Sequence, residues 1–266
     1  MAYSNPGAYE RFMGRWSARL APLFVRFVGV KDEHRILDVG CGTGSLSREL
    51  LALGRTIRVD GVDPVADYVS FARQTTPSPR AEFKVASGHA LPFANATFDA
   101  ALALLVLQDV ADPNRTVAEM ARVTRPGGPV AACQWDFRDG LPMLSLMWRA
   151  AETVAPEAVA RYHTGNPKLP CGRADLAELA KLWPRSELSE VRTTSLELSM
   201  EFASFDDFWV PFLGGATSTS TFAAAVDEET GGALATELRN MIPKMRPDGS
   251  FVLPARAWAV AGIAGH

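Results

Sequence analysis

Apolar residues between positions 36 and 137 fall into short runs separated by amphipathic stretches. Strands are predicted at residues 36–40, 56–63, 81–87, 98–110 and 129–137. Apolar positions at helical spacing predict helices at 45–54, at 65–74 and in a segment that ends before Pro126. The run at 98–110 is too apolar to face water on either side, as in a central parallel strand. This alternation favours an α/β fold with a doubly wound parallel sheet and right-handed crossovers.

The regular alternation ends after residue 140. Helices are predicted at 141–155 and 173–183, and strong alternation predicts a strand at 191–202. An insertion at about 203–248 with a partly helical pattern precedes a closing strand at 251–263. We expect this insertion to form a lid or substrate cap.

The first predicted strand runs into a glycine-rich loop, ILDVGCGTG, at Ile36–Gly44. Glycine accepts positive φ and has no side chain, so such a loop lets the backbone approach a nucleotide-like ligand closely. A dinucleotide fingerprint needs Gly-x-Gly-x-x-Gly, whereas Ser45 occupies that third place and the glycine comes one residue early, at Gly44. Asp38 precedes the loop, and its carboxylate would repel a diphosphate and attract an amino group.

Composition narrows the class of ligand. The 266 residues carry a net charge of −3, with 47% hydrophobic and 21% charged residues, so nucleic acid is a poor fit as substrate and a small neutral or cationic molecule is favoured. Three isolated cysteines disfavour a disulfide framework and a zinc site, and we expect no metal. The charged N-terminus and the absence of an apolar run of about 18 residues predict a cytoplasmic protein with no membrane segment.

The glycine loop closely resembles motif I of the class I S-adenosylmethionine-dependent methyltransferases, acid-x-Gly-x-Gly-x-Gly. Leu-Pro-Phe at 91–93, the segment LLVLQDVADP after the fourth strand, and Arg-Pro-Gly-Gly at 125–128 also match the family's pattern. The resemblance covers roughly residues 33–136, and it identifies the chain as similar to the small-molecule, type 11-like members. It implies a Rossmann-like, seven-stranded, mostly parallel sheet in the order 3-2-1-4-5-7-6 with the last strand antiparallel. On this basis we expect an N-terminal helical cap at 1–30 and a methyltransferase domain at 31–266.

In an open parallel sheet the ligand lies beyond the carboxyl ends of the strands, where the winding direction reverses. The predicted contacts to the methionine part of the cofactor are Asp38, Gly40, Cys41, Gly42 and Gly44. Asp63, about 20 residues beyond the loop, is placed to accept hydrogen bonds from both ribose hydroxyls, with Pro64 opening the next helix. Asp60 is the alternative, but it points to the other face of the strand.

The adenine end of the site departs from the family pattern. The resemblance places Ser87 where relatives carry an adenine-binding acid, followed by Gly88 and His89 as further contacts. A serine hydroxyl can accept one hydrogen bond from the amine but lacks the charge-assisted part. Leu104 at the end of the fourth strand and Gln108, where many relatives carry His, complete the predicted cofactor contacts.

The N-terminal segment YERFMGRW suggests a lid over the methionine moiety. Tyr9, Met13 and Trp16 have spacings of four and three residues, which place them on one helical face. We therefore include all three among the expected cofactor contacts.

Methyl transfer from a sulfonium needs alignment and exclusion of water more than a fixed catalytic residue. Candidate bases for a hydroxyl or acidic carbon acceptor are Asp136, His163, Asp109 and Tyr162, although a lone residue of this kind in a loop is more often a surface residue or helix cap. The amide-methylating Asn/Asp-Pro-Pro-aromatic segment is missing, because residues 103–106 read ALLV. Aromatic residues are abundant after the fifth strand and in the insertion, at Trp135, Phe137, Trp148, Phe205, Phe208, Trp209 and Phe212.

If some of these aromatic residues line a pocket rather than pack in the core, the acceptor is a small apolar or ring-bearing molecule. The resemblance predicts a methyltransferase that uses S-adenosylmethionine and releases S-adenosylhomocysteine. Two alternatives stay open: a NAD-type oxidoreductase, disfavoured by the glycine spacing, and a non-catalytic protein that binds S-adenosylmethionine. The acceptor atom, whether oxygen, nitrogen or carbon, and the oligomeric state are not determined by the sequence.

Overall fold

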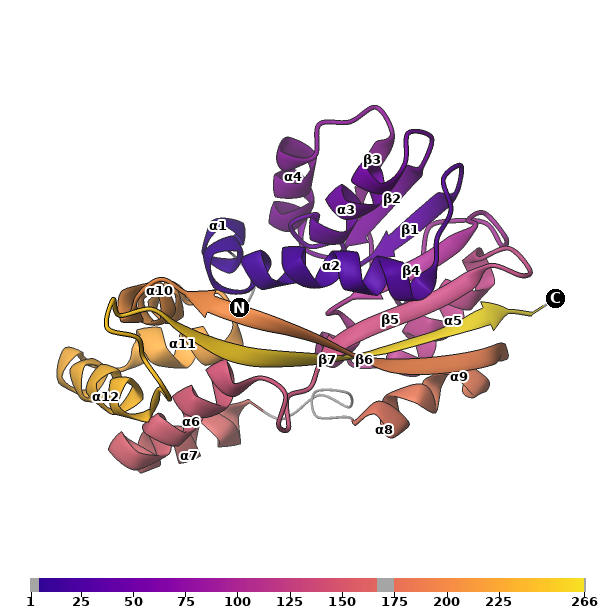
Figure 1. Cartoon of the computed structure of the whole chain (residues 1–266). Helices are drawn as coiled ribbons and strands as arrows, with labels where there is room; N and C mark the ends of the chain where they lie inside the picture. The colour runs from indigo at the N-terminus through magenta and orange to yellow at the C-terminus, as the bar shows by residue number, and fades with distance from the viewer. Residues whose placement is uncertain (1–4, 167–174, 266) are drawn as a thin grey trace.

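A computed structural model describes residues 5–166 and 175–265 and shows a seven-stranded sheet in the order β3-β2-β1-β4-β5-β7-β6 (Figure 1). The strands are β1 (Arg35–Val39), β2 (Arg58–Asp63), β3 (Ala81–Val85), β4 (Ala100–Leu104), β5 (Pro129–Trp135), β6 (Leu188–Phe202) and β7 (Phe251–Ala264). The first five strands are parallel, and β7 is antiparallel to both β5 and β6. The predicted fold class, strand order and antiparallel last strand are therefore confirmed.

Alternate residues of the central parallel strands face two apolar layers, which is why β1, β4 and β5 are almost entirely buried, whereas the edge strand β3 is partly exposed. On one side lie α2 (Arg15–Val28), α3 (Ser45–Leu53) and α4 (Ala66–Thr75). On the other lie α5 (Pro113–Val123), α8 (Leu176–Ala180) and α9 (Leu182–Arg185). Ile36 faces the first layer and its neighbour Leu37 faces the second, both fully buried.

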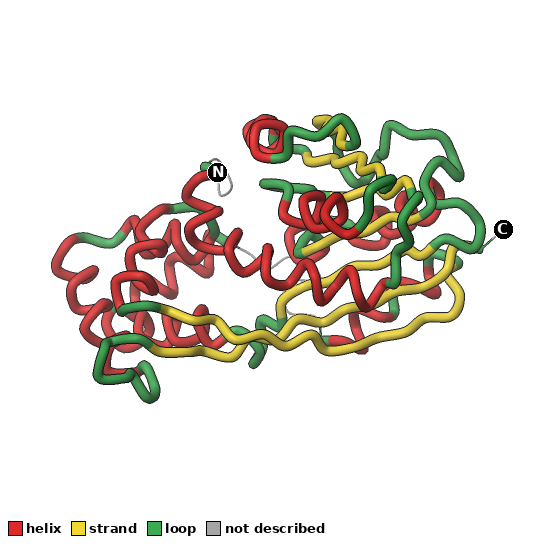
Figure 2. Tube along the Cα trace, turned by 45° about the horizontal axis from the view of Figure 1, so that its top comes forward, coloured by secondary structure: helices red, strands yellow, loops and turns green. Residues whose placement is uncertain are grey.

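A second group of helices lies beyond the sheet, where the long strands β6 and β7 extend past the parallel strands (Figures 1 and 2). This helical lobe comprises α6 (Pro142–Val154), α7 (Pro156–Gly165), α10 (Phe205–Trp209), η3 (Val210–Gly214), α11 (Ser218–Ala225) and α12 (Glu228–Met241). The rings of Phe202 and Phe251 stack with centroids 5.0 Å apart where β6 and β7 enter the lobe. The insertion at 203–248 thus forms helices that share one core with the sheet.

Three local predictions need correction. The strand predicted at 98–110 ends at Leu104, because Leu105 turns into the left-handed region at φ +62° and a 3-10 turn, η2 (Leu107–Asp109), follows. Pro64 does not open α4, since the helix begins at Ala66 after its N-cap Val65. The helix predicted at 173–183 is two short helices in its described part, α8 and α9.

The N-terminal segment, α1 (Pro6–Tyr9), η1 (Glu10–Gly14) and α2, is one continuous helix interrupted by the π-helical turn η1. It crosses from the helical lobe to the parallel strands (Figure 2). Among the described residues, no helix has the length and apolar character needed to cross a membrane.

Candidate functional site

The glycine loop is anchored to the neighbouring strand end by its backbone. The N–H groups of Gly40 and Cys41 both donate to the carbonyl of Val62, at 2.7 and 2.9 Å. Gly40, Gly42 and Gly44 have φ values of +69°, +51° and +90°, conformations that favour glycine. A Cβ on Gly40 would lie 2.4 Å from the side chain of Val106, whereas a Cβ on Gly42 would have no neighbour closer than 3.9 Å. Gly40 is therefore required for packing, whereas a Cβ on Gly42 would make only ordinary van der Waals contacts, with Tyr68 and the Gly40 carbonyl.

Asp63, at the carboxyl end of β2, joins this loop. Its Oδ2 accepts a hydrogen bond from the Gly42 N–H at 3.0 Å, and its Oδ1 accepts one from the Val65 N–H at 2.9 Å. Each carboxylate oxygen keeps a further lone pair for a ligand hydroxyl. Burial raises the pKa of Asp63 despite these two bonds. The alternative acid, Asp60, is engaged by the Arg35 guanidinium at 2.9 and 3.0 Å.

Asp38 lies almost fully buried beneath the loop, with 1% of its surface exposed. Its Oδ2 accepts a hydrogen bond from the Ser47 hydroxyl at 2.6 Å, and its Oδ1 has no partner among the described residues. The pKa of Asp38 is raised to about 7, mainly by burial and in part by the nearby charge of Asp63, while the hydrogen bond from Ser47 opposes the shift. A buried carboxylate oxygen without a partner, beside a loop of glycines, fits a cationic ligand group.

The end of β3 presents the predicted adenine contacts. The Ser87 side chain is exposed, and its hydroxyl accepts a hydrogen bond from the His89 N–H at 3.2 Å. Gly88 lies against α5, where an added Cβ would be 3.1 Å from Thr116. The His89 carbonyl accepts from Arg115 at 2.7 Å, and His89 Nε2 is a buried nitrogen without a partner in the described chain. These groups are placed together, and their role in adenine binding stays a prediction.

The end of β4 is shaped by the left-handed Leu105. The Leu105 N–H donates to the carbonyl of Cys133 at 2.7 Å, so the chain leaves the sheet directly after Leu104. Gln108 follows in η2, and its buried Oε1 also has no partner in the described part of the chain. An apolar residue with positive φ stores strain, and such strain concentrates at functional sites.

The N-terminal segment reaches the site through Tyr9. The rings of Tyr9 and Tyr68 meet edge to face with centroids 5.7 Å apart, which ties α1 to α4. Burial raises the pKa of Tyr9 to about 12. Because η1 is a π-helix, the spacing of four and three residues does not keep one face: Trp16 packs against Phe202 of β6, with centroids 5.2 Å apart, and Met13 is buried in the core. Of the predicted lid residues, Tyr9 contacts the helix that follows Asp63, and cofactor contacts of Met13 and Trp16 stay a prediction.

The four candidate bases are widely separated. Asp136 is 2% exposed and forms an ion pair with Arg256 at 2.6 Å, a structural role at the end of β5. The Tyr162 hydroxyl donates to the Ser218 carbonyl at 2.6 Å, and His163 lies against the Trp148 ring with centroids 4.9 Å apart, both in the helical lobe. Asp109 is exposed in η2, and its charge acts on Tyr9 and Tyr68. Asp109 is thus close enough to act on the pair of tyrosines beside the glycine loop.

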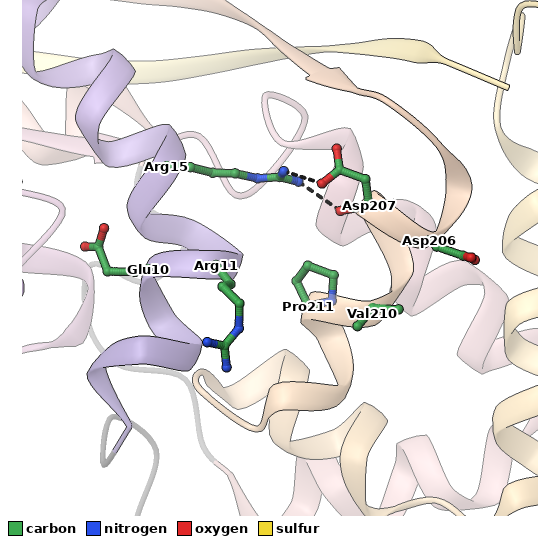
Figure 3. Close-up of a pocket in the computed structure, with 7 residues that line it drawn as sticks. All are labelled: Glu10, Arg11, Arg15, Asp206, Asp207, Val210 and Pro211. Carbon is green, nitrogen blue, oxygen red and sulfur yellow. Dashed lines mark hydrogen bonds and ion pairs between the residues drawn. The ribbon is translucent and has the colours of Figure 1, made fainter. Parts of the chain in front are cut away.

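A groove of about 460 Å³ separates the N-terminal segment from the helical lobe (Figure 3). Arg15 crosses it, donating from Nη1 to the Asp207 carboxylate at 2.7 Å and from Nη2 to the Asp207 carbonyl at 3.0 Å. Arg11 points into the gap, while Glu10 points away from it (Figure 3). Val210 and Pro211 form the apolar side, and Val210 is 57% exposed.

The aromatic residues of the insertion do not line this groove. Phe205, Phe208, Trp209 and Phe212 are all buried, and Phe208 packs against Phe202, Phe212 and Phe251. Trp135 is also buried, whereas Phe137 and Trp148 are partly exposed. Core packing, the alternative left open by the sequence, accounts for most of this group.

Four residues at the site were missed by the sequence argument: Glu10, Ser47, Arg48 and Tyr68. Tyr68 lies five residues after Asp63, on the first turns of α4, and its ring carbon Cδ1 is 3.9 Å from where a Gly42 Cβ would lie. Helical periodicity after Asp63 places Tyr68 on the buried face of α4. This periodicity is the one sequence pattern that indicates Tyr68 as a residue near the site.

Comparison with known proteins shows which family the chain resembles. Residues 37–132 match the family model described as a methyltransferase domain. A demethylmenaquinone methyltransferase from Renibacterium salmoninarum is 30% identical over 162 residues, which cover 61% of this chain and 65% of that protein. The chain thus spans less than two thirds of the length of that relative, and about half that of similar Mycobacterium proteins.

Two solved structures share the fold. The YcgJ protein from Bacillus subtilis has a TM-score of 0.59 at 17% identity, covering 93% of this chain and 99% of that one. A phosphoethanolamine N-methyltransferase from Haemonchus contortus, in complex with S-adenosylhomocysteine, has a TM-score of 0.59 at 15% identity, covering 98% of this chain and 57% of that one. At these identities the likeness establishes the fold alone.

Proposed function

Because residues 37–132 belong to the class I S-adenosylmethionine-dependent methyltransferases, we propose that this chain transfers a methyl group from S-adenosylmethionine to a small-molecule acceptor. The observation that carries the proposal is the direct bond between the loop and the acid. The Gly42 N–H donates to Asp63 at 3.0 Å, so the groups expected to bind the methionine and ribose parts adjoin.

The residues present fit this cofactor. Buried polar atoms without partners among the described residues lie at or after the carboxyl ends of β1, β3 and β4, at Asp38 Oδ1, His89 Nε2 and Gln108 Oε1. Such atoms cost free energy unless a ligand or water satisfies them, typically about 1–3 kcal/mol each. The ammonium group of S-adenosylmethionine can donate to Asp38 Oδ1 and Gln108 Oε1, and the adenine amino group and ring nitrogens can pair with His89 Nε2.

We assign the methionine part to Asp38 and the loop at Gly40–Gly44, including Cys41, and the ribose to Asp63 beside Pro64. Ser87, Gly88 and His89 are assigned to adenine, Leu104 and Gln108 to the amino-acid end, and Tyr9 to a lid. S-adenosylmethionine supplies an electrophilic methyl group whose leaving thioether is neutral. The protein's own part is then to align the acceptor and exclude water.

The groove between the N-terminal segment and the helical lobe is the place we propose for acceptor entry. Its apolar side, Val210 and Pro211, supports a small molecule with an apolar portion. The Renibacterium relative is named for demethylmenaquinone, an acceptor with a ring, which agrees with that class. Asp109 is the proposed base where the acceptor carries an acidic proton, since Asp136 is held by Arg256.

Isothermal titration with S-adenosylhomocysteine tests the cofactor assignment, and a panel of small phenols, quinols and amines with detection of S-adenosylhomocysteine release tests transfer. We expect binding, and release that depends on the acceptor. Binding of NAD without S-adenosylhomocysteine would instead support an oxidoreductase. Binding of S-adenosylmethionine with no acceptor-dependent release would support a non-catalytic binding protein.

A further inference from the structure

A pair of aromatic rings, Tyr9 and Tyr68, lies beside the glycine loop, where the charges of several carboxylates act on it. Tyr68 is 4% exposed, and its hydroxyl is buried without a partner in the described chain. Its ring carbon Cδ1 lies 3.9 Å from where a Cβ on Gly42 would be, and its ring meets that of Tyr9 with centroids 5.7 Å apart. The phenol remains neutral, because burial raises its pKa.

The charges around Tyr68 are mostly negative. The acids that act on its phenol are Asp63, Glu10 and Asp109, in decreasing order. Glu10 has a buried carboxylate oxygen without a hydrogen bond, and this oxygen forms a long ion pair with Arg48 at 4.0 Å. Arg48 is itself held on the outside of the loop by the Thr43 carbonyl at 2.7 Å and by Thr75 at 3.2 Å.

The position of Tyr68 in the site determines which part of the cofactor it can contact. In S-adenosylmethionine the sulfur joins the ribose to the methionine chain. If Asp63 binds the ribose and the loop binds the methionine chain, the sulfur lies at the junction of Asp63 and Gly42. The ring of Tyr68 approaches Gly42 at this junction. The methyl donor carries a positive charge on that sulfur, and the demethylated product does not.

We propose that Tyr68 and Glu10 make the site selective for the charged sulfonium over the neutral thioether. This rests on the proposed function, and it adds a specificity that cofactor binding alone does not require. An aromatic face and a nearby carboxylate both stabilise a cation. After methyl transfer the sulfur of S-adenosylhomocysteine is neutral, so the product makes neither interaction. The Tyr68 hydroxyl, by contrast, serves a group common to both ligands. The consequence is weak product inhibition.

Calorimetric dissociation constants for S-adenosylmethionine and S-adenosylhomocysteine, measured on the whole chain, test this. We expect the wild type to bind the sulfonium about tenfold more tightly than the thioether. In Glu10→Gln and Tyr68→Leu, affinity for S-adenosylmethionine should fall about tenfold and affinity for S-adenosylhomocysteine by less than about twofold. Tyr68→Phe keeps the ring, so it should weaken both ligands equally and leave their ratio unchanged. Asp67→Asn, an exposed acid on the same helix, is the control and should change neither.

The outcomes separate the two proposals. A wild type that binds both ligands equally, or equal losses for both ligands in Glu10→Gln, overturns the selectivity while the methyltransferase assignment stands. Loss of the preference in Tyr68→Phe overturns the role of the ring. A wild type that binds neither ligand overturns the proposed function, and the selectivity with it. Thermal unfolding of each variant identifies any that fail to fold. If Tyr68→Leu fails to fold, the two affinities of Glu10→Gln, which keeps the size and shape of the side chain, decide whether the site is selective.

Discussion

The Asp63 carboxylate accepts a hydrogen bond from the Gly42 backbone at 3.0 Å, which joins the end of β2 to the glycine loop after β1. The loop is also held by the Val62 carbonyl, so three consecutive N–H groups, Gly40 to Gly42, donate to the end of one strand. The cofactor site therefore depends on both strand ends being in register, as the parallel pairing of Val39 with Val62 provides.

Replacing Asp63 by Ala should weaken S-adenosylhomocysteine binding by about 2–3 kcal/mol, roughly 30- to 150-fold, because both the ribose contacts and the tether to Gly42 are lost. Isothermal titration measures this directly. The matched control is Asp67→Asn, an exposed acid four residues on, which should bind as the wild type does. Equal affinity in Asp63→Ala would remove Asp63 from the site.

Gly42→Ala should impair binding far more than folding. The φ of +51° imposes a cost of about 1 kcal/mol on Ala, but the added Cβ has no neighbour within 3.8 Å and would occupy the space assigned to the cofactor. Gly127→Ala is the matched control, since Gly127 has φ +80° and nothing within 4 Å, in the turn before β5.

Thermal melts should show similar small losses of stability for the two glycine variants, and titration should show lost cofactor affinity for Gly42→Ala alone. If Gly42→Ala binds as tightly as Gly127→Ala does, the open side of the loop is not where the cofactor lies.

The sequence predicted the sheet and the glycine loop well because both depend on local patterns. Asp38 and Asp63 lie at strand ends that apolar runs mark clearly, so their proximity follows from parallel topology. Tyr9 meeting Tyr68, and Arg15 pairing with Asp207, join residues 59 or more positions apart, and no local pattern encodes such contacts. The π-helical turn at Glu10–Gly14 shifts the helical face, which is why Trp16 does not share the side of Tyr9.

Asp38 should make the stability of the unliganded protein fall as pH rises. Burial raises its pKa from 3.8 to about 7, so the folded state binds more protons than the unfolded state between these values. Its contribution is fully present below about pH 4 and is lost as pH rises through 7, by up to about 4 kcal/mol. The Asp38→Asn variant lacks this titration.

Thermal unfolding of both proteins from pH 5 to pH 8 tests this, and the stability of Asp38→Asn relative to the wild type should increase across the range. A constant difference would show that Asp38 is already ionised in the folded protein. Affinity for S-adenosylmethionine should rise with pH through 7 in the wild type alone, because the ionised carboxylate attracts the cofactor's ammonium group.

Breaking the Arg15 contact with Asp207 should loosen the N-terminal segment with little loss of global stability. About a third of each side chain is exposed, so Arg15→Ala should cost about 1 kcal/mol or less in unfolding free energy. Hydrogen exchange of residues 8–14 should speed up, because this pair ties the segment across the groove to α10. Restored protection in the double variant Arg15→Asp, Asp207→Arg would support the role of the ion pair. Unchanged hydrogen exchange in Arg15→Ala would show that apolar contacts alone hold the N-terminal segment in place.

The central claim is that the strand ends around Gly42 and Asp63 bind S-adenosylmethionine. Isothermal titration of the whole wild-type chain with S-adenosylmethionine, and in parallel with NAD, tests it most directly. The account predicts saturable binding of one S-adenosylmethionine per chain and none of NAD. Saturable binding of NAD with no heat from S-adenosylmethionine would contradict it.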